Sequence, residues 1–226
     1  MFFERKALAF LLKMFDDYRT QGSRKQLVKE LKAKGITDDA VLDAIGKIPR
    51  HCFVLPSLKE RAYADTPLPI ACKQTISQPY TVAVQTELLE IKRQHRILEI
   101  GTGSGYQAAI LKQMGAYVYT IERQRNLYES AKKIFQTLSL SIACTYGDGY
   151  KGWAEFAPFD RALITCGCVE APQELLNQLA VGGILVAPVG NDDVQEMIKI
   201  VKKSDTEYSK TSHGAFRFVP MLRDEV

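Results

Sequence analysis

The feature that most constrains the fold is a short apolar segment that leads directly into a run of glycines. Residues 96–105 read RILEIGTGSG, and the apolar part is bounded by charge before it and by glycine after it. This pattern is typical of a strand buried in a parallel sheet. Gly101, Gly103 and Gly105 allow a sharp turn that brings the backbone close to a ligand, because glycine has no Cβ. With a helix predicted over residues 106–114, the stretch is typical of the nucleotide-binding corner of a doubly wound fold.

The glycine spacing separates the classes of ligand. A dinucleotide fingerprint needs a glycine at position 106, where the chain has Tyr106, and no glycine run is followed by the Lys and Ser or Thr of a P-loop. The pattern is instead E-x-G-x-G-x-G. Its acidic residue, Glu99, suits a ligand with a cationic amino group, such as S-adenosylmethionine, better than a pyrophosphate. We therefore expect a nucleoside site, and the alternative is a glycine turn with a purely structural role. Among the alternative functions, a dehydrogenase is the weakest.

Two further acidic residues follow predicted strands. Glu122 comes after the strand predicted over residues 117–121, where it could accept hydrogen bonds from both ribose hydroxyls or merely cap the next helix. Asp148 lies between Gly147 and Gly149 after a third predicted strand, and it could accept a hydrogen bond from an adenine amino group. An aspartate between glycines is otherwise an ordinary turn.

Composition narrows the class of protein. A chain of 226 residues with 46% hydrophobic and 25% charged residues is expected to form one globular domain over residues 1–226, with residues 1–50 as a helical flank. The net charge of +4 is mild and the basic residues are dispersed, so neither a nucleic-acid nor a membrane partner is expected. Five cysteines without a C-x-x-C pair predict a reduced cytoplasmic chain without a metal site. The apolar start of the chain is too short for a secretion signal. We also expect the protein to be a monomer.

The N-terminal flank is predicted as two helices. A capping box of Ser23 with Gln26 opens the first, which ends at Gly35. The second follows Thr37 and stops before Pro49.

A long irregular segment, residues 51–78, precedes the next predicted helix. Pro79 occupies the first turn of that helix, and Ser77 or Gln78 is its expected cap. A loop of this length is more often functional than idle.

The rest of the chain alternates strands and helices. This alternation predicts a doubly wound, mostly parallel sheet, and the absence of a helix between the last two strands predicts an antiparallel C-terminal edge. The predicted elements are a helix over 123–138, strands over 142–145 and 159–164, a helix over 172–179 ended by Gly182 and Gly183, and strands over 184–189, 196–201 and 215–219.

Several motifs together identify a family. The chain contains QTISQP, EIGTGSGYQAA, GDG, PFD, APVG and FRFVPML, and with them it resembles the protein-L-isoaspartate O-methyltransferases. The resemblance covers about nine-tenths of the chain, from near Ser23 to the C-terminus. Any methyltransferase that uses S-adenosylmethionine could share the glycine motif, whereas TISQP and the FVP tail are specific to this family.

The resemblance implies a Rossmann-like class I methyltransferase. It would use S-adenosyl-L-methionine, leave S-adenosyl-L-homocysteine, and methylate the carboxylate of L-isoaspartyl residues in damaged proteins and peptides. Ser77 corresponds to the active-site serine, and the implied substrate-binding residues are Ser77, Gln78, Phe218, Val219 and Pro220. The implied cofactor-binding residues are Thr75, Ile76, Glu99, Gly101, Thr102, Gly103, Gly105, Glu122, Arg123, Gly147 and Asp148.

One loop departs from the family pattern. Ala71, Cys72 and Lys73 stand where a glycine-rich G-x-G is usual, which bears on the flexibility of the loop and on turnover. A cofactor-binding protein without catalysis is therefore one alternative. A methyltransferase of the same fold acting on a small molecule or on RNA is another.

Overall fold

The computed structural model describes residues 16–191, 194–224 and 226. The expectation that the chain has no secretion signal concerns residues 1–15, which lie outside the described residues. In the described ranges, no helix has the length and apolar character needed to cross a membrane.

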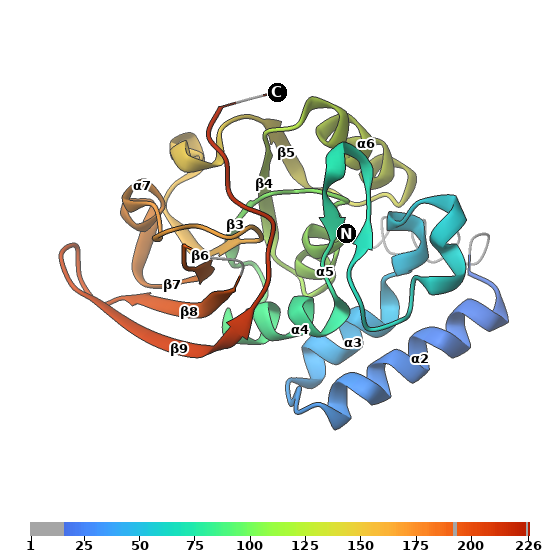
Figure 1. Cartoon of the computed structure of the whole chain (residues 1–226). Coiled ribbons are helices and arrows are strands. Elements are labelled where there is room, and N and C mark those ends of the chain that lie inside the picture. The colour runs from blue at the N-terminus through green and yellow to red at the C-terminus, as the bar shows by residue number, and fades with distance from the viewer. Residues whose placement is uncertain (1–15, 192–193, 225) are drawn as a thin grey trace.

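A seven-stranded sheet forms the centre of the molecule (Figure 1). Its strand order is β5-β4-β3-β6-β7-β8-β9. Strands β3 to β7 pair in parallel, and β8 is antiparallel to both of its neighbours. The predicted fold class, a mostly parallel doubly wound sheet with an antiparallel C-terminal edge, is confirmed. The strands are β3 (Arg96–Ile100), β4 (Tyr117–Glu122), β5 (Ala143–Tyr146), β6 (Phe159–Ile164), β7 (Leu179–Val189), β8 (Gln195–Lys202) and β9 (Tyr208–Phe216).

Helices cover both faces of this sheet. On β3, Ile97 belongs to the apolar cluster shared with α2 to α6, whereas Leu98 and Ile100 belong to the cluster shared with α7. Because both faces are buried, β3 is apolar at every position between Arg96 and Ile100 except Glu99. The α-helices of the described residues are α2 (Tyr18–Ala33), α3 (Asp39–Lys47), α4 (Pro79–Leu88), α5 (Tyr106–Gln113), α6 (Arg125–Thr137) and α7 (Gln173–Asn177).

The start of the first described helix differs from the prediction. Asp17 is the N-cap of α2, and its carboxylate accepts a hydrogen bond from the Thr20 backbone N–H at 2.7 Å. Ser23 lies inside the helix, so the predicted capping box of Ser23 with Gln26 is wrong. Serine can cap or continue a helix, and the earlier Asp17 cap decided the boundary here.

Two C-terminal predictions are also wrong in position. Strand β7 begins at Leu179 and contains Gly182 and Gly183, so these glycines do not end a helix. Strand β9 is Tyr208–Phe216 rather than residues 215–219. Its residues are almost all exposed, because it lies at the edge of the sheet, so it lacks the apolar alternation by which strands are recognised.

The segment predicted as irregular contains a small hairpin of β1 (Leu68–Pro69) and β2 (Thr75–Ile76). At its tip, Cys72 and Lys73 both have left-handed backbone conformations, with φ of 57° and 56°. Glycine adopts this conformation without steric cost, whereas other residues pay about 1 kcal/mol each. Glycine would adopt this turn without that cost, whereas this chain adopts it with two larger residues.

Candidate functional site

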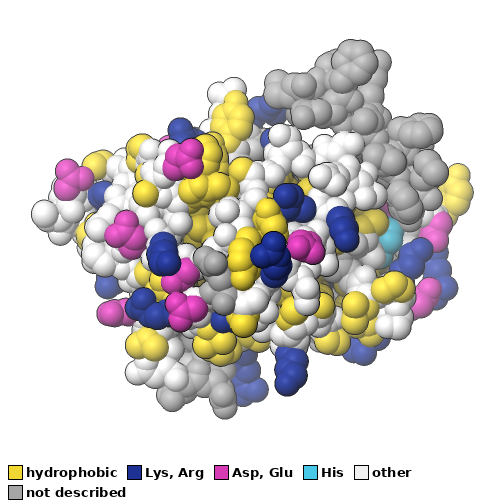
Figure 2. Space-filling model, turned by 90° about the horizontal axis from the view of Figure 1, so that it is seen from above, with side chains coloured by type: hydrophobic (Ala, Val, Ile, Leu, Met, Phe, Trp, Pro, Cys, Tyr) yellow, Lys and Arg dark blue, Asp and Glu magenta, His cyan; other side chains and the backbone are white. Residues whose placement is uncertain are grey.

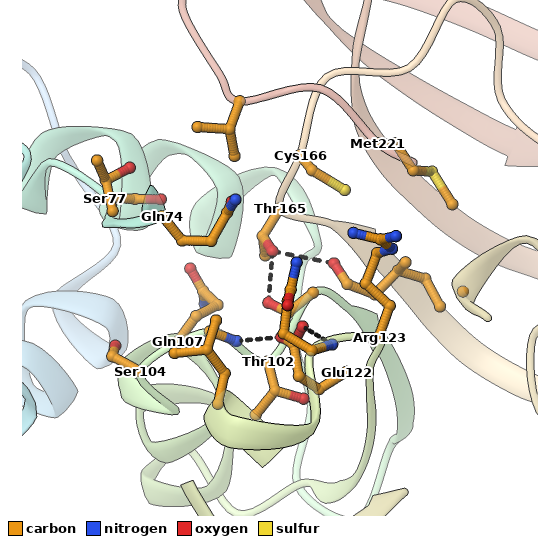
Figure 3. Close-up of a pocket in the computed structure, with 18 of the residues that line it drawn as sticks. Gln74, Ser77, Thr102, Ser104, Gln107, Glu122, Arg123, Thr165, Cys166 and Met221 are labelled. Carbon is orange, nitrogen blue, oxygen red and sulfur yellow. Dashed lines mark hydrogen bonds between the residues drawn. The ribbon is translucent and has the colours of Figure 1, made fainter. Parts of the chain in front are cut away.

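The sheet brings three strand ends together. Ile100 at the end of β3 pairs in register with Ile121 of β4 and with Ile164 of β6. The residues that follow them, among them Gly101 and Thr165, therefore meet at one edge of the sheet. The chain leaves β3 and β6 toward opposite sides there, which is where doubly wound folds bind ligands. A cavity opens at this point, and we call it the nucleoside cavity (Figure 3).

The glycine turn adopts the conformation that its sequence predicts. Gly101, Gly103 and Gly105 all have positive φ, at 93°, 54° and 85°. The Gly101 N–H donates to the Ile121 carbonyl at 2.9 Å, which ties the turn to β4. A Cβ on Gly101 would lie 2.6 Å from Thr165 Oγ1, so this turn also requires glycine for space.

Glu122 holds the turn from the neighbouring strand. Its carboxylate is 5% exposed and accepts from the Gly103 N–H and from the Gln124 N–H, each at 2.8 Å. Burial raises the pKa of this carboxyl above its ordinary value. The Gln124 contact joins Glu122 to the N-cap residue of α6, and no side-chain hydrogen bond caps this helix. The helix-cap interpretation of Glu122 is therefore wrong. Glu122 lines the nucleoside cavity, and its contact with a ribose stays a prediction.

Glu99 lies behind the cavity. It is fully buried and does not line the cavity, and the Thr120 side chain is a hydrogen-bonding neighbour of its carboxyl. Burial raises its pKa to about 8; the Thr120 contact opposes this shift and the nearby charge of Glu122 adds to it. The carboxyl is therefore mostly protonated at neutral pH.

Three other predicted cofactor residues also lie off the cavity wall, namely Gly105, Gly147 and Asp148. Asp148 accepts from the Tyr150 N–H at 2.9 Å, the contact expected of an ordinary turn. Its neighbour Gly149 lines the cavity instead. An adenine contact of Asp148 stays a prediction.

Ser77 is half-buried just before α4 and lines the nucleoside cavity. Gln78 is the N-cap residue of α4, one of the two predicted positions, but its side chain makes no hydrogen bond to the helix. Asp65 accepts from the Tyr80 N–H at 2.8 Å instead. The cap thus comes from a residue outside the helix, and local sequence gives no sign of it.

Arg50 holds the segment that carries Ser77. Its side chain is fully buried, and it donates to the carbonyls of Ala62 and Ser77, both at 2.9 Å. The guanidinium also lies over the Tyr106 ring, 4.9 Å from the centroid. Burial lowers the pKa of Arg50 from its high ordinary value. One arginine therefore connects the Ser77 segment to the start of α5.

A second cavity adjoins the first, and we call it the outer cavity. Four residues line both cavities, namely Thr75, Ser77, Thr165 and Val219. Of the predicted substrate-binding residues, Gln78 and Phe218 line only the outer cavity and Pro220 lines only the nucleoside cavity. The tail is fixed between them, because the Val219 carbonyl accepts from the Gly167 N–H at 2.8 Å.

The nucleoside cavity collects most of the predicted residues and some that were not predicted. The predicted residues on its wall are Thr75, Ile76, Ser77, Gly101, Thr102, Gly103, Glu122, Arg123, Val219 and Pro220. The lining residues absent from the prediction include Gln74, Ser104, Tyr106, Gln107, Gln124, Thr165, Cys166, Met221 and Leu222. Most of these lie inside QTISQP, EIGTGSGYQAA or FRFVPML, so membership of a motif was the signal that could have found them.

The chain is similar to known proteins over most of its length. The family model described as protein-L-isoaspartate(D-aspartate) O-methyltransferase matches residues 22–226. The protein-L-isoaspartate O-methyltransferase of Christiangramia forsetii is 55% identical over 213 residues, which cover 94% of this chain and 100% of the relative. The enzyme of that name from Flavobacterium johnsoniae is 53% identical, with the same coverage.

Solved structures show the same fold. A protein-L-isoaspartate O-methyltransferase superposes with a TM-score of 0.79 at 30% identity, covering 87% of this chain and 65% of that longer one. A Plasmodium falciparum protein described as a beta-aspartate methyltransferase (PCMT), solved in complex with S-adenosyl-L-homocysteine, gives a TM-score of 0.78 at 25% identity. That match covers 89% of this chain and 99% of the other.

Proposed function

Since the chain belongs to the protein-L-isoaspartate(D-aspartate) O-methyltransferase family, we propose that it transfers a methyl group from S-adenosylmethionine to L-isoaspartyl carboxylates in damaged proteins and peptides. The methyl ester then cyclises to a succinimide without the enzyme, and hydrolysis returns part of it to normal aspartate. The observation that carries the proposal is the shared wall of the two cavities. Ser77 and Thr165 lie where a cofactor in one cavity and a peptide in the other would meet.

The residues of the nucleoside cavity fit S-adenosylmethionine. Gly101 and Gly103 line the cavity without side chains, and the Glu122 carboxylate offers acceptors to a ribose. The residues that would hold the cofactor are Thr75, Ile76, Gly101, Thr102, Gly103, Glu122 and Arg123 from the wall, supported from behind by Glu99, Gly105, Gly147 and Asp148. S-adenosylmethionine, when bound, supplies an electrophilic methyl group on a sulfonium.

The protein need not supply a strong base. A carboxylate substrate is already ionised at neutral pH, so the chain has only to orient it and exclude water. We assign this role to Ser77, whose hydroxyl would donate a hydrogen bond to the substrate carboxylate. Orientation of this kind can lower the activation free energy by several kcal/mol. Substrate contacts are assigned to Gln78, Phe218, Val219 and Pro220, with the tail pairing to the peptide as an added strand.

The same proposal covers the partners of the chain. Basic and acidic side chains lie interspersed on the face drawn in Figure 2, which offers no broad basic surface to a nucleic acid (Figure 2). We propose that the chain acts as a single-domain monomer in the cytoplasm, on isoaspartyl proteins and peptides.

The test of this function uses one peptide in two forms. Transfer of a labelled methyl group from S-adenosylmethionine is measured to the L-isoaspartyl peptide and, in parallel, to the L-aspartyl peptide. We expect transfer to the first alone. Binding of the cofactor without transfer to either peptide would contradict the proposed substrate and leave the cofactor site standing.

Ser77→Ala should lower turnover of the isoaspartyl peptide by about 10- to 100-fold, because a hydrogen bond to a charged group is lost at the reacting carboxylate. Steady-state kinetics measures the loss. As a control, calorimetry should give an affinity for S-adenosylhomocysteine within about twofold of wild type. Wild-type turnover in the variant would remove Ser77 from the mechanism.

Glu122→Ala should weaken cofactor binding by roughly 1 to 3 kcal/mol, because the ribose hydroxyls lose their acceptor. Calorimetry with S-adenosylhomocysteine measures this change. Glu129→Ala removes an exposed carboxylate from α6 and serves as the matched control, for which we expect wild-type affinity. Unchanged affinity in the Glu122 variant would withdraw the ribose assignment.

Arg50→Lys should lower the turnover number by about tenfold while cofactor affinity stays within about twofold, because lysine cannot span two carbonyls as the planar guanidinium does. Arg161→Lys is a matched control. Arg161 is also buried and donates to the backbone carbonyls of Leu89 and Glu90. Both variants should lower the melting temperature, and only the Arg50 variant should lose turnover. Equal turnover in the two variants would show that Arg50 is purely structural.

A further inference from the structure

Gln107 lines the nucleoside cavity and has a buried acceptor without a hydrogen-bond partner among the described residues. It lies in the first turn of α5, lines the cavity and is 7% exposed. Its side-chain Nε2 donates to Thr86 Oγ1 at 2.9 Å. Its Oε1 is buried and has no hydrogen-bond partner among the described residues. A buried amide carbonyl normally has a partner, and because Gln107 belongs to the wall of the nucleoside cavity, a bound ligand could supply one.

The hydrogen-bond chain behind Gln107 fixes which way the amide faces. The Thr86 hydroxyl has a single hydrogen, and it donates that hydrogen to the Val82 carbonyl at 2.6 Å. The Thr86 oxygen can therefore only accept from Gln107. An amide rotated by 180° would place two acceptors against each other, so the carbonyl oxygen must be the atom turned away from Thr86.

The place of Gln107 identifies the part of the ligand that it would meet. Figure 3 shows Gln74, Ser77, Ser104 and Gln107 on one side of the cavity, and Arg123 and Met221 on the other. With the ribose assigned to Glu122, the amino-acid part of the cofactor extends toward the Ser77 side. This placement rests on the proposed function.

The chemistry of the acceptor selects one group. The carboxylate of the cofactor and the carboxylate of an isoaspartyl substrate are both acceptors only, and Gln107 Oε1 cannot bond to either. The α-ammonium of the cofactor is the donor at that end. A neutral carbonyl accepts from it without adding a negative charge beside the substrate carboxylate, which must also enter the site.

We propose that Gln107 Oε1 accepts a hydrogen bond from the α-ammonium group of S-adenosylmethionine, with Thr86 as the positioning residue that orients the amide. Gln107 thereby recognises the amino-acid part of the cofactor, as Glu122 recognises the ribose.

The test compares two ligands by calorimetry. One is S-adenosylhomocysteine, and the other is the analogue in which hydrogen replaces its α-amino group. Wild type should bind the first about tenfold or more tightly than the second, as expected for a hydrogen bond to a charged group. In Gln107→Met the affinity for S-adenosylhomocysteine should fall by about tenfold and that for the analogue should stay within about twofold. Equal losses for both ligands, or no loss, would overturn the proposal.

Three variants separate recognition from folding. Gln85→Met is the matched control, because Gln85 is also a buried amide with an unpaired Oε1 but does not line the nucleoside cavity. It should keep the wild-type ratio of the two affinities. Thr86→Val should reduce that ratio, whereas Thr86→Ser, which keeps the hydroxyl, should have the wild-type ratio. A ratio in Thr86→Val equal to that of wild type would overturn the positioning role.

The outcomes also distinguish this proposal from the proposed function. A wild-type chain that binds neither ligand would contradict the proposed function itself. A wild-type chain that binds both ligands equally well would contradict only the role of Gln107. The melting temperature of each variant without ligand shows whether it has folded.

Discussion

Gly105→Ala should destabilise the protein by roughly 2 to 5 kcal/mol, because two costs add at this position. Gly105 has φ of 85°, a conformation that alanine adopts only with strain. A Cβ there would also lie 2.6 Å from Cε1 and 2.8 Å from Cζ of Phe135, which is buried in α6. Urea unfolding measures the loss. The affinity for S-adenosylhomocysteine should fall as well, because the Gly105 N–H donates to the carbonyl of Thr102 on the cavity wall.

Gly182→Ala separates the two costs. Gly182 has nearly the same φ, 81°, but nothing lies within 4 Å of the Cβ position. This variant should lose only the strain energy, about 1 to 2 kcal/mol, and should keep its cofactor affinity. Equal losses of stability in the two variants would contradict the close packing of the glycine turn against α6.

Buried elements of this fold follow from the sequence. The predicted bounds of β3 and β6 match the structure, because each strand is mostly apolar on both faces and has clear ends, with charge only at Arg96 and Glu99 in β3 and at Asp160 and Arg161 in β6. The helix α6 likewise buries Leu127, Ala131 and Phe135 on one face, as its spacing predicts. In these segments the local sequence pattern and the tertiary environment both require apolar side chains at the same positions.

Elements whose limits depend on distant residues do not follow from the sequence. Strand β9 is held by its pairing with β8, and its exposed polar residues carry no sign of a strand. The side-chain cap of α4 comes from Asp65, which lies outside the helix. Both are tertiary contacts, and no local pattern encodes them.

The functional site was also predicted only in part. The strand ends and the glycines predicted the correct edge of the sheet, since parallel strands bring such residues together. The sequence did not show on which side of the backbone each group lies. Glu99 follows an apolar residue and precedes another in β3, and the pleat turns its carboxyl into the interior rather than onto the cavity wall.

Glu99→Gln should stabilise the protein increasingly as the pH rises from about 5 to about 8, by roughly 1 kcal/mol per pH unit. The pKa of Glu99 is about 8 in the folded protein, against an ordinary value of 4.5. Between these values the folded state keeps a proton that the unfolded state has released. The stability that this carboxyl contributes is therefore complete below the ordinary pKa and is lost as the pH rises through the folded one. Glutamine has no such loss.

Urea unfolding of both proteins without cofactor, at intervals between about pH 5 and pH 9, measures this difference. The difference in the free energy of unfolding should grow to about pH 8 and then level off, because Glu99 is ionised in both states above that point. Parallel stability curves over the whole range would contradict the raised pKa.

The same series with saturating S-adenosylhomocysteine tests the predicted link between Glu99 and the amino-acid part of the cofactor. A cation bound near a buried carboxyl favours its ionised form and lowers its pKa. If the α-ammonium lies near Glu99, the difference in the free energy of unfolding between Glu99→Gln and wild type should grow less with pH when the ligand is bound. Binding of the ligand near neutral pH should also release a proton in wild type but not in Glu99→Gln. An unchanged slope would leave Glu99 as a buried structural carboxyl, and the acceptor for the ammonium would then be Gln107 alone.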